Sequence, residues 1–261
     1  MSVETACCTF HTIYATAMTT TSPLRFAATC MALKQGHGSQ IEVLMVRRNP
    51  ELSFGGMWTF PGGVVEEADG AMPDVSDGFD EDTMRWEDPS VVATAANAAV
   101  REAREETALN CAVSSLTWFS HWLPPKVGPP KRFGTWFFLA PEHAGTVVVD
   151  DTENDEARWV SAATALEESA AGRFPLATPT WVTLDDLAQA TDIASLIDHA
   201  LTQGPSWYHT RKLVSADPSA PPVMGWPGDA GYESENADEP GARNRVVTNK
   251  KFEIVERVRS V

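Results

Sequence analysis

The chain has 261 residues, of which 43% are hydrophobic and 21% charged, and its 36 acids against 20 bases give a net charge of −16. This apolar content excludes a disordered chain, and the lack of any run of about 18 apolar residues excludes a membrane-spanning helix. Proteins that bind nucleic acid or anionic membranes need a dominant basic face, so we expect neither as a partner.

The four cysteines lack the C-x-x-C spacing of zinc and redox sites and are too few for a disulfide scaffold. We therefore expect reduced thiols and a cytoplasmic location. Residues 1–23 show no basic segment followed by an apolar one, so we interpret them as a disordered leader rather than a secretory signal. Residues 24–261 are predicted to form one domain, with an acidic insertion at 70–90 and a C-terminal extension at 204–261.

The first half of this domain predicts strands and then one long helix. Residues 24–34 and 41–47 are rich in β-favouring apolar residues on either side of a turn, which indicates a β-hairpin. Residues 70–90 are acidic and have little periodicity, so we predict a surface insertion that contributes little to the core. Residues 91–109 are rich in Ala and Glu and lack Gly and Pro, which predicts a helix.

The second half predicts more strands, then helices and a final hairpin. Strands are predicted at 112–123, 132–140 and 145–149, an acidic loop at 150–156, helices at 162–171 and 184–203 with a break near Thr191, an irregular segment at 217–240 and a hairpin at 245–258. Strands and helices do not alternate regularly. We therefore predict an α/β fold in the broad sense, of the α+β kind, with a mixed sheet rather than a doubly wound one.

The predicted helix at 91–109 carries the strongest chemical signal. Its R-E-x-x-E-E sequence at 101–106 places three carboxylates and one guanidinium on one stripe, because residues four apart share a helix face. Taken alone, the pattern also fits a solvated face with ordinary ion pairs. The F-P-G-G turn at 60–63 favours a site, because such a loop can place carboxylates beside backbone that a ligand approaches closely. Oxygen ligands without imidazole or thiolate select Mg²⁺ or Mn²⁺, the ions that assist attack on phosphorus.

With these motifs the sequence resembles the Nudix hydrolases, whose box reads G-x5-E-x7-R-E-U-x-E-E-x-G-U, where U is an aliphatic residue. Gly63 takes the first position, and Asp69 stands where the box has its second-position Glu. Arg101 lies 32 positions after Asp69 rather than 8, so about 24 residues are inserted. Ala108 stands where the box has its last Gly. The resemblance implies a Nudix α-β-α sandwich with a mixed β-sheet.

The Asp and the long insertion inside the box resemble the peroxisomal coenzyme A diphosphatase branch, as do the segments at 122–125 and 131–138. The resemblance implies Mg²⁺- or Mn²⁺-dependent hydrolysis of a pyrophosphate bond in a nucleoside diphosphate derivative. Coenzyme A or its acyl thioesters are the first substrate candidate, and dinucleotides or nucleoside diphosphate sugars are the alternative. A non-catalytic ligand sensor with a Nudix fold is the competing class. The expected partner is a small nucleotide-type substrate, and a homodimer stays open.

The resemblance also implies roles for individual residues. Catalysis is expected from Glu102, Arg101 and Glu105, in which Arg101 orients the glutamates and Glu102 is a metal ligand or the base. The expected metal ligands are Glu102, Glu105, Glu106 and either Glu153 or Glu156. The expected substrate-binding residues are Arg47, Arg48, Gly62, Gly63, Lys131 and Arg132. Arg47 matches the first arginine of a motif found upstream of F-P-G-G in coenzyme A hydrolases, whereas Leu52 stands at the second. The alternative for Glu153 and Glu156 is a solvated acidic loop, and the alternative for Arg47 and Arg48 is a solvated strand end.

Overall fold

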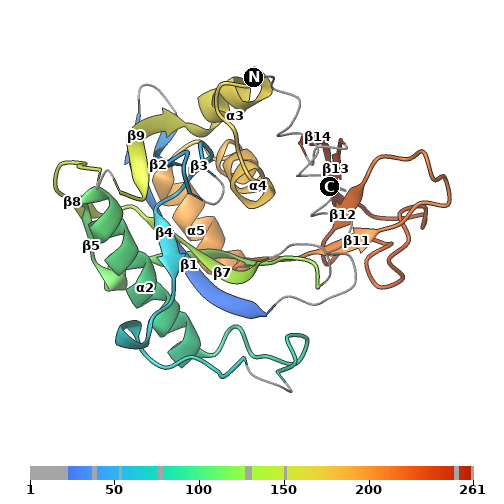
Figure 1. Cartoon of the computed structure of the whole chain (residues 1–261), viewed down its shortest axis with the longest axis horizontal. Helices are drawn as coiled ribbons and strands as arrows, with labels where there is room; N and C mark the ends of the chain where they lie inside the picture. Colours follow the sequence, from blue (N-terminus) through green and yellow to red (C-terminus); the bar gives the residue numbers. More distant parts are fainter. Residues whose placement is uncertain are drawn as a thin grey trace, which may run out of the picture. The chain divides into compact units, whose positions relative to one another are not determined.

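The computed structural model describes residues 23–36, 40–52, 55–75, 79–126, 131–149, 152–249 and 253–259. The chain divides into two compact units (Figure 1). Unit 1 comprises Met1–Arg25, Trp122–Gly134 and Trp207–Val261, and unit 2 comprises Phe26–His121 and Thr135–Ser206. The expected leader at 1–23 falls, except for its last residue, outside the described residues. The predicted single domain with its insertion and extension stays a prediction.

A mixed β-sheet forms the centre of unit 2, as the predicted α+β class requires. Its strands are β1 (Leu24–Gln35), β2 (Ile41–Arg48), β3 (Trp58–Thr59), β4 (Gly62–Val64), β6 (Thr117–Leu123), β7 (Arg132–Ala140) and β9 (Asn154–Ser161). The order is β6-β7-β1-β2-β3, with β4 also paired to β1 and β9 to β2. The predicted hairpin is confirmed, because β1 and β2 pair antiparallel with Leu33 opposite Val43.

The long helix α2 (Pro89–Thr107) lies on one side of this sheet (Figure 1). It begins after Asp88, whose side chain accepts the Ser90 N–H at 2.9 Å, a normal N-cap. Its buried side is made of small residues that let it lie close to the sheet: Ala95, Ala96, Ala98, Ala99 and Ala103. It ends at Thr107, and the next residue, Ala108, has a left-handed φ of 57°. That conformation favours glycine, which explains why the family box has Gly there.

Three further helices follow in unit 2, and Figure 1 shows α4 and α5 on the side of the sheet away from α2. They are α3 (Ala162–Ala170), α4 (Thr178–Leu187) and α5 (Ile193–Gln203). The predicted break near Thr191 is confirmed, since α5 begins after Asp192, which accepts the Ser195 N–H at 2.8 Å. Shorter elements are the 3-10 turns η1 (Glu67–Asp69) and η2 (Val113–Ser115) and the two-residue strands β5 (Asn110–Cys111) and β8 (His143–Ala144), which pair with each other.

The strand predicted at 145–149 is wrong. Gly145 has a φ of 113°, and the segment makes no ladder; instead the Val148 N–H donates to Thr107 O at 3.0 Å, at the end of α2. Val148 is 60% exposed, so its apolar side chain does not mark a buried strand. The predicted acidic loop at 150–156 is also shorter than expected, because β9 begins at Asn154.

The acidic segment 70–90 contributes to the core, contrary to expectation. Trp86 is 3% exposed, and its ring contacts those of Phe26, His121 and Trp136 at centroid distances of 6.0, 4.5 and 5.6 Å. The Trp86 indole N–H donates to Glu81 O at 3.1 Å. Hydrophobic periodicity does not indicate this anchor, because a single aromatic residue in an irregular segment forms no repeating pattern.

Trp86→Ala should therefore lower the free energy of unfolding by about 3–5 kcal/mol, since it removes a large buried side chain. Arg85→Ala is the matched control, because the Arg85 side chain is 76% exposed. Arg85→Ala should change the free energy of unfolding by no more than about 0.5 kcal/mol. Denaturant unfolding of both variants measures the difference, and equal stabilities would show that Trp86 is not a core anchor.

Unit 1 contains an antiparallel sheet in the order β11-β12-β13-β14. Its strands are β11 (Arg211–Leu213), β12 (Val223–Gly225), β13 (Asn244–Thr248) and β14 (Ile254–Arg259). The last two form the predicted final hairpin, with Val246 opposite Arg257. β10 (Ser206–His209) pairs with β6, whose last residues Trp122 and Leu123 also belong to unit 1. The segment 217–240 is irregular apart from β12, yet it buries Trp226 completely.

Asp229 and Arg245 form a buried ion pair within unit 1, with side chains that are 0% and 7% exposed. Burial raises the pKa of Asp229, but hydrogen bonds from Arg245 and from the N–H groups of Asn244 and Gly231 lower it further, to about 2. The folded-state pKa thus lies below the ordinary value of 3.8. Its stabilisation is present above that value and is lost as the pH falls through about 2.

Asp229→Asn should therefore remove about 2 kcal/mol of the stability that the protein loses between pH 4 and pH 2. The measurement is the free energy of unfolding across that range. Glu235→Gln, at an exposed position of the same segment, is the control and should keep the slope of the original protein. An unchanged slope in the Asp229→Asn variant would contradict the ion-pair assignment.

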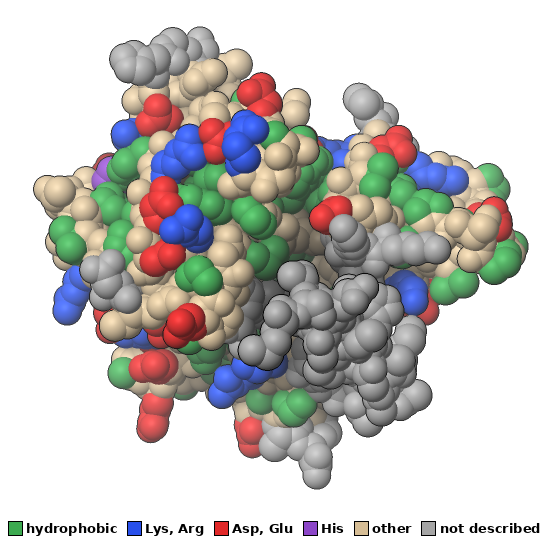
Figure 2. All heavy atoms as spheres, turned by 45° about the horizontal axis from the view of Figure 1, so that its top comes forward, with side chains coloured by type: hydrophobic (Ala, Val, Ile, Leu, Met, Phe, Trp, Pro, Cys, Tyr) green, Lys and Arg blue, Asp and Glu red, His purple; other side chains and the backbone are tan. Residues whose placement is uncertain are grey.

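Two surface properties bear on function. Among the described residues, no helix is both long and apolar enough to cross a membrane. On the face drawn in Figure 2, Lys and Arg side chains lie among Asp and Glu side chains and form no continuous basic patch. The cytoplasmic location and the homodimer stay predictions.

Candidate active site

The F-P-G-G loop is packed against the centre of the sheet. Phe60 is 1% exposed, and the next carbonyl, Pro61 O, accepts the Cys30 N–H at 2.8 Å. A Cβ on Gly62 would overlap the backbone of Ala28 in β1, and a Cβ on Gly63 would overlap the Glu102 carboxylate. Both glycines therefore allow a close approach, of the loop to β1 and of α2 to the loop.

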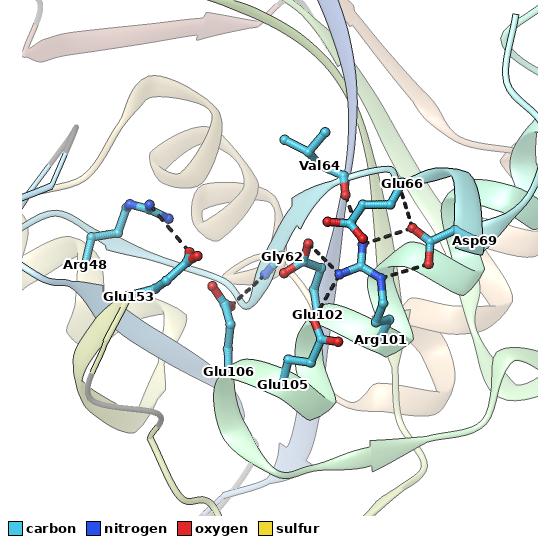
Figure 3. Close-up of polar contacts among 10 residues, drawn as sticks. All are labelled: Arg48, Gly62, Val64, Glu66, Asp69, Arg101, Glu102, Glu105, Glu106 and Glu153. Carbon is cyan, nitrogen blue, oxygen red and sulfur yellow. Dashed lines mark hydrogen bonds and ion pairs between the residues drawn. The ribbon is translucent and has the colours of Figure 1, made fainter.

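Arg101 is the centre of the polar network on α2 (Figure 3). Its Nε and Nη2 donate to the two carboxylate oxygens of Asp69, both at 2.9 Å. Its Nη1 donates to Glu102 Oε1 at 3.0 Å and to Glu105 Oε2 at 2.9 Å. Nη2 also donates to Val64 O at 3.0 Å. One guanidinium thus binds three carboxylates and the carbonyl of Val64, the residue that follows the two glycines in β4.

Asp69 is fixed in position by its own backbone contacts. The Glu66 N–H donates to Asp69 Oδ2 at 2.8 Å, and the Asn97 side chain donates to Asp69 O at 2.9 Å. Burial raises the pKa of Asp69, but the hydrogen bonds from Arg101 and Glu66 outweigh it and keep the pKa below its ordinary value. Asp69 in turn raises the pKa of Arg101, so both partners remain charged.

Glu106 is the most deeply buried carboxylate of the motif, at 4% exposed. It accepts the Gly62 N–H at 3.0 Å through Oε2. Burial raises its pKa to about 7, although hydrogen bonds from Asn154 and Gly62 oppose the shift. Burial likewise raises the pKa of Glu102, against the effect of Arg101 and with repulsion from Glu105 and Glu153. These carboxylates are therefore costly as anions unless a cation lies beside them.

The structure separates the two candidates for the distant metal ligand. Glu153 lies beside Glu106 and faces Arg48, whose Nη2 is 3.8 Å from Glu153 Oε2 (Figure 3). The negative charge of Glu153 also helps to raise the pKa of Glu102. Glu156 instead pairs with Arg47 Nη1 at 3.1 Å. Of the two, Glu153 is the one gathered with the α2 carboxylates.

Arg47 and Arg48 differ in how fully acidic side chains neutralise their guanidinium groups. Arg47 forms a two-point contact with Asp155, with Nε–Oδ1 at 2.8 Å and Nη2–Oδ2 at 3.0 Å, in addition to its pair with Glu156. Among the described residues, the buried Nε of Arg48 has no hydrogen-bond partner. The guanidinium of Arg47 is therefore neutralised, while Arg48 keeps donor capacity close to the carboxylates.

Lys131 and Arg132 belong to unit 1, whereas the carboxylate network belongs to unit 2. Arg132 is 4% exposed and donates to Pro125 O at 3.0 Å and to Pro124 O at 3.2 Å. Arg132 therefore holds the proline-rich loop, which continues through residues 127–130 outside the described part. Lys131 is exposed.

Sequence reasoning missed two polar residues of this site. Asn97 precedes Arg101 by one helical turn, so its spacing on the α2 face could have indicated that it contacts the same partner. Asn154 is completely buried next to Glu106. Nothing in the sequence marks it, because its position at the start of β9 depends on the pairing of that strand with β2.

The residues fit a divalent metal in their chemistry. The side chains gathered here, Glu102, Glu105, Glu106 and Glu153, offer only hard oxygen donors, which Mg²⁺ and Mn²⁺ prefer. A cation would also stabilise the two carboxylates whose pKa values burial raises. Within the described ranges, no three Asp, Glu, His or Cys side chains converge closely enough to form a metal cluster by themselves. In the present arrangement Arg101 binds oxygens of Glu102 and Glu105.

The NUDIX domain family matches residues 23–181, which include the glycine loop, Asp69, all of α2 and β9. The chain belongs to the NUDIX domain family. It is therefore a pyrophosphohydrolase, and Nudix hydrolases generally use divalent metals. The match ends inside α4, so the β11–β14 sheet of unit 1 lies beyond it.

Solved structures of this family resemble the chain. A NUDIX hydrolase from Alicyclobacillus acidocaldarius has a TM-score of 0.53 and 23% identity over 68% of this chain and 96% of that chain. A MutT NUDIX hydrolase from Burkholderia pseudomallei has a TM-score of 0.42 and 17% identity, and the match covers 62% of this chain and 96% of that chain. The NUDIX domain of Shewanella oneidensis NrtR, complexed with ADP ribose, has a TM-score of 0.43 and 16% identity, and the match covers 72% of this chain and 97% of that chain. The first of these supports the Nudix fold. A search of curated proteins gave no match.

Proposed function

We propose that this Nudix pyrophosphohydrolase cleaves the pyrophosphate bond of a nucleoside diphosphate derivative of the coenzyme A type. A Mg²⁺ or Mn²⁺ ion would be held by Glu105, Glu106 and Glu153, with Glu102 beside them as a further ligand or as the base. The observation that carries the proposal is the Arg101 network, which holds Asp69, Glu102 and Glu105 beside Val64 and the glycine loop. Three carboxylates share one guanidinium in this network, which leaves an excess of negative charge that a divalent cation would offset.

Each residue of the network has a distinct task. Arg101 fixes the directions of Glu102 and Glu105, because its planar fork sets the position of each oxygen it binds. Glu102 accepts a proton from the attacking water, a role for which burial raises its pKa in the useful direction. Gly63 leaves the space that the Glu102 carboxylate occupies. A bound divalent ion would neutralise phosphate charge. Two phosphate-bearing products then leave.

The coenzyme A branch is supported by the contact between Asp69 and Arg101. These residues lie 32 positions apart, and their two-point ion pair brings the two parts of the interrupted box together. The Asp at the second box position thus has the task of holding Arg101. In the chain, the inserted segment follows η1, which ends at Asp69, and precedes α2, which begins at Pro89. The insertion inside the box is the feature that resembles this branch.

Arg48 is a better candidate than Arg47 for the phosphate groups of the substrate. Arg48→Ala should raise KM for coenzyme A by about 10-fold or more, because it removes a charged hydrogen-bond donor beside the carboxylates. Arg47→Ala is the matched neighbour and should change KM by less than about 3-fold, since Asp155 and Glu156 already neutralise it. Equal KM values in the two variants would remove Arg48 from the substrate site.

A general nucleotide pyrophosphatase is the second candidate. Leu52 stands where the coenzyme A motif has its second arginine, and Arg47 at the first is bound by Asp155 and Glu156. Both observations weaken recognition of a 3′-phosphate. A non-catalytic sensor has less support, because Glu102, Glu105 and Glu106 are all retained.

The test is product formation on a substrate panel with Mg²⁺, with Mn²⁺ and with a chelator. The panel contains coenzyme A, an acyl-coenzyme A, ADP-ribose, a dinucleotide and a nucleoside diphosphate sugar. We expect metal-dependent release of 3′,5′-ADP and 4′-phosphopantetheine from coenzyme A, with the highest kcat/KM of the panel. A higher kcat/KM for the dinucleotide moves the assignment to the general nucleotide pyrophosphatase, and binding without turnover moves it to the sensor.

A further inference from the structure

Two cysteines that the proposed hydrolysis does not use lie in contact inside unit 2. Cys30 belongs to β1 and Cys111 to β5, and their Sγ atoms are 3.8 Å apart although 81 positions separate them in the sequence. Both are free thiols, with Cys30 0% exposed and Cys111 8% exposed. The fold creates this contact, because one cysteine lies in the central strand and the other follows the end of α2.

We propose that Cys30 and Cys111 form a redox site, at which a peroxide joins the two sulfurs in a reversible disulfide. A disulfide has its sulfurs about 2.05 Å apart, so the two atoms must approach by about 1.8 Å. β1 is fixed by pairing with β2 and β4. β5 has two residues and pairs with β8 in a separate two-stranded sheet, so Cys111 is the sulfur that moves.

The two thiols have different tasks in this oxidation. The Cys30 thiol donates its hydrogen to the Cys111 sulfur, and solvent reaches Cys111 only. That hydrogen bond lowers the pKa of Cys111 and raises that of Cys30. Cys111 therefore supplies the thiolate that attacks the peroxide, while Cys30 is the buried resolving thiol.

The two steps balance. The Cys111 thiolate attacks one peroxide oxygen, the O–O bond breaks, and a sulfenic acid forms with release of hydroxide. The Cys30 thiol then attacks the sulfenic sulfur, the S–S bond forms and the S–O bond breaks. The departing hydroxide takes the thiol proton and leaves as water. In sum, two thiols lose two hydrogens and one hydrogen peroxide becomes two waters.

The bond would act on the neighbouring carboxylate site. The Cys30 N–H holds Pro61 O, and the adjacent Thr29 pairs with Gly62, whose N–H binds Glu106. Cys111 follows α2, which carries Glu106 in its last turn. Drawing Cys111 toward β1 therefore pulls the end of α2 relative to the glycine loop. Displacements of about 1 Å in catalytic groups can cost about 100-fold in rate. This consequence, unlike the bond itself, rests on the proposed function.

The experiment uses the full chain with Cys7→Ser and Cys8→Ser, so that Cys30 and Cys111 are its remaining cysteines. The protein is treated with hydrogen peroxide, free thiols are alkylated, and unreduced peptides are mapped by mass spectrometry. We expect a peptide pair that joins Cys30 to Cys111 and that dithiothreitol releases. Further substitution Cys111→Ser or Cys30→Ala should abolish it. The absence of the joined peptides, with Cys111 oxidised alone or not at all, overturns the site.

A second readout separates the bond from its effect. Pyrophosphate hydrolysis by the oxidised protein should fall at least about 10-fold and recover with dithiothreitol, whereas the Cys111→Ser variant should lose no activity that dithiothreitol restores. A joined peptide pair with unchanged hydrolysis overturns the effect on the active site. If no substrate of the panel is cleaved, the peptide map still decides the bond, so failure of the proposed function and failure of this inference remain distinguishable.

Discussion

Glu106→Gln is expected to lower kcat by about 1000-fold or more and to leave the protein folded. Removing a negative charge from a hard-cation site should cost several kcal/mol of transition-state stabilisation. Gln keeps an oxygen that can accept the Gly62 N–H, so the local hydrogen bond can survive. Product release at saturating Mg²⁺ measures the effect. Glu167→Gln, at an exposed position of α3, is the matched control and should be silent.

The same substitution should increase stability when metal is removed by a chelator. Burial raises the folded-state pKa of Glu106 to about 7, above its ordinary value of 4.5. The folded state then holds the proton more tightly than the unfolded state does. Stability contributed by this group is present below about pH 4.5 and is lost as the pH rises through about 7. The Glu106→Gln variant lacks that loss, so at pH 8 it should be more stable by up to about 3 kcal/mol.

Added Mg²⁺ gives an independent measurement on these proteins. Mg²⁺ should raise the Tm of the original protein, because a ligand that binds the folded state stabilises it. It should raise the Tm of the Glu106→Gln variant much less. An unchanged kcat in this variant, or an equal rise in Tm with Mg²⁺, would contradict the assignment of Glu106 as a metal ligand.

The carboxylate face of α2 could be predicted because it is local. Residues 101–106 lie within two helical turns, so spacing alone places their side chains on one stripe. The contact that orders this stripe was beyond local reasoning. Asp69 and Arg101 meet across 32 positions, and only the resemblance to the interrupted family box brought them into one motif.

Other features depended on tertiary packing, and there the predictions were less good. Val147 and Val148 have strand-like side chains, but the chain at Gly145 turns back to the end of α2 instead of joining the sheet. Trp86 lies in a segment whose acidic composition is typical of a surface loop, and its burial depends on rings from β1, β6 and β7. Composition describes the average of a segment, whereas one residue can anchor it.

Arg101→Lys is expected to lower both activity and stability, although it keeps the charge. A lysine ammonium is a point charge with three donors and cannot reproduce the planar fork that binds Asp69, Glu102, Glu105 and Val64 together. Asp69, with its side chain 4% exposed, would lose its two-point partner. Loss of one member of a buried ion pair costs about 3–5 kcal/mol, and the part of this network left exposed should reduce that figure to about 2–4 kcal/mol.

The activity should fall by about 100-fold, because Glu102 and Glu105 would no longer be held in fixed directions. Arg104→Lys, one turn along the same helix and exposed, is the matched control and should change neither activity nor stability.

The double substitution with Asp69→Asn separates the effect on activity from the effect on stability. If Arg101 acts on catalysis through Glu102 and Glu105, Asp69→Asn alone should reduce stability more than kcat. The double variant should then have the kcat of Arg101→Lys. An Arg101→Lys protein that loses stability but keeps its kcat would show that the guanidinium only joins α2 to the segment before it.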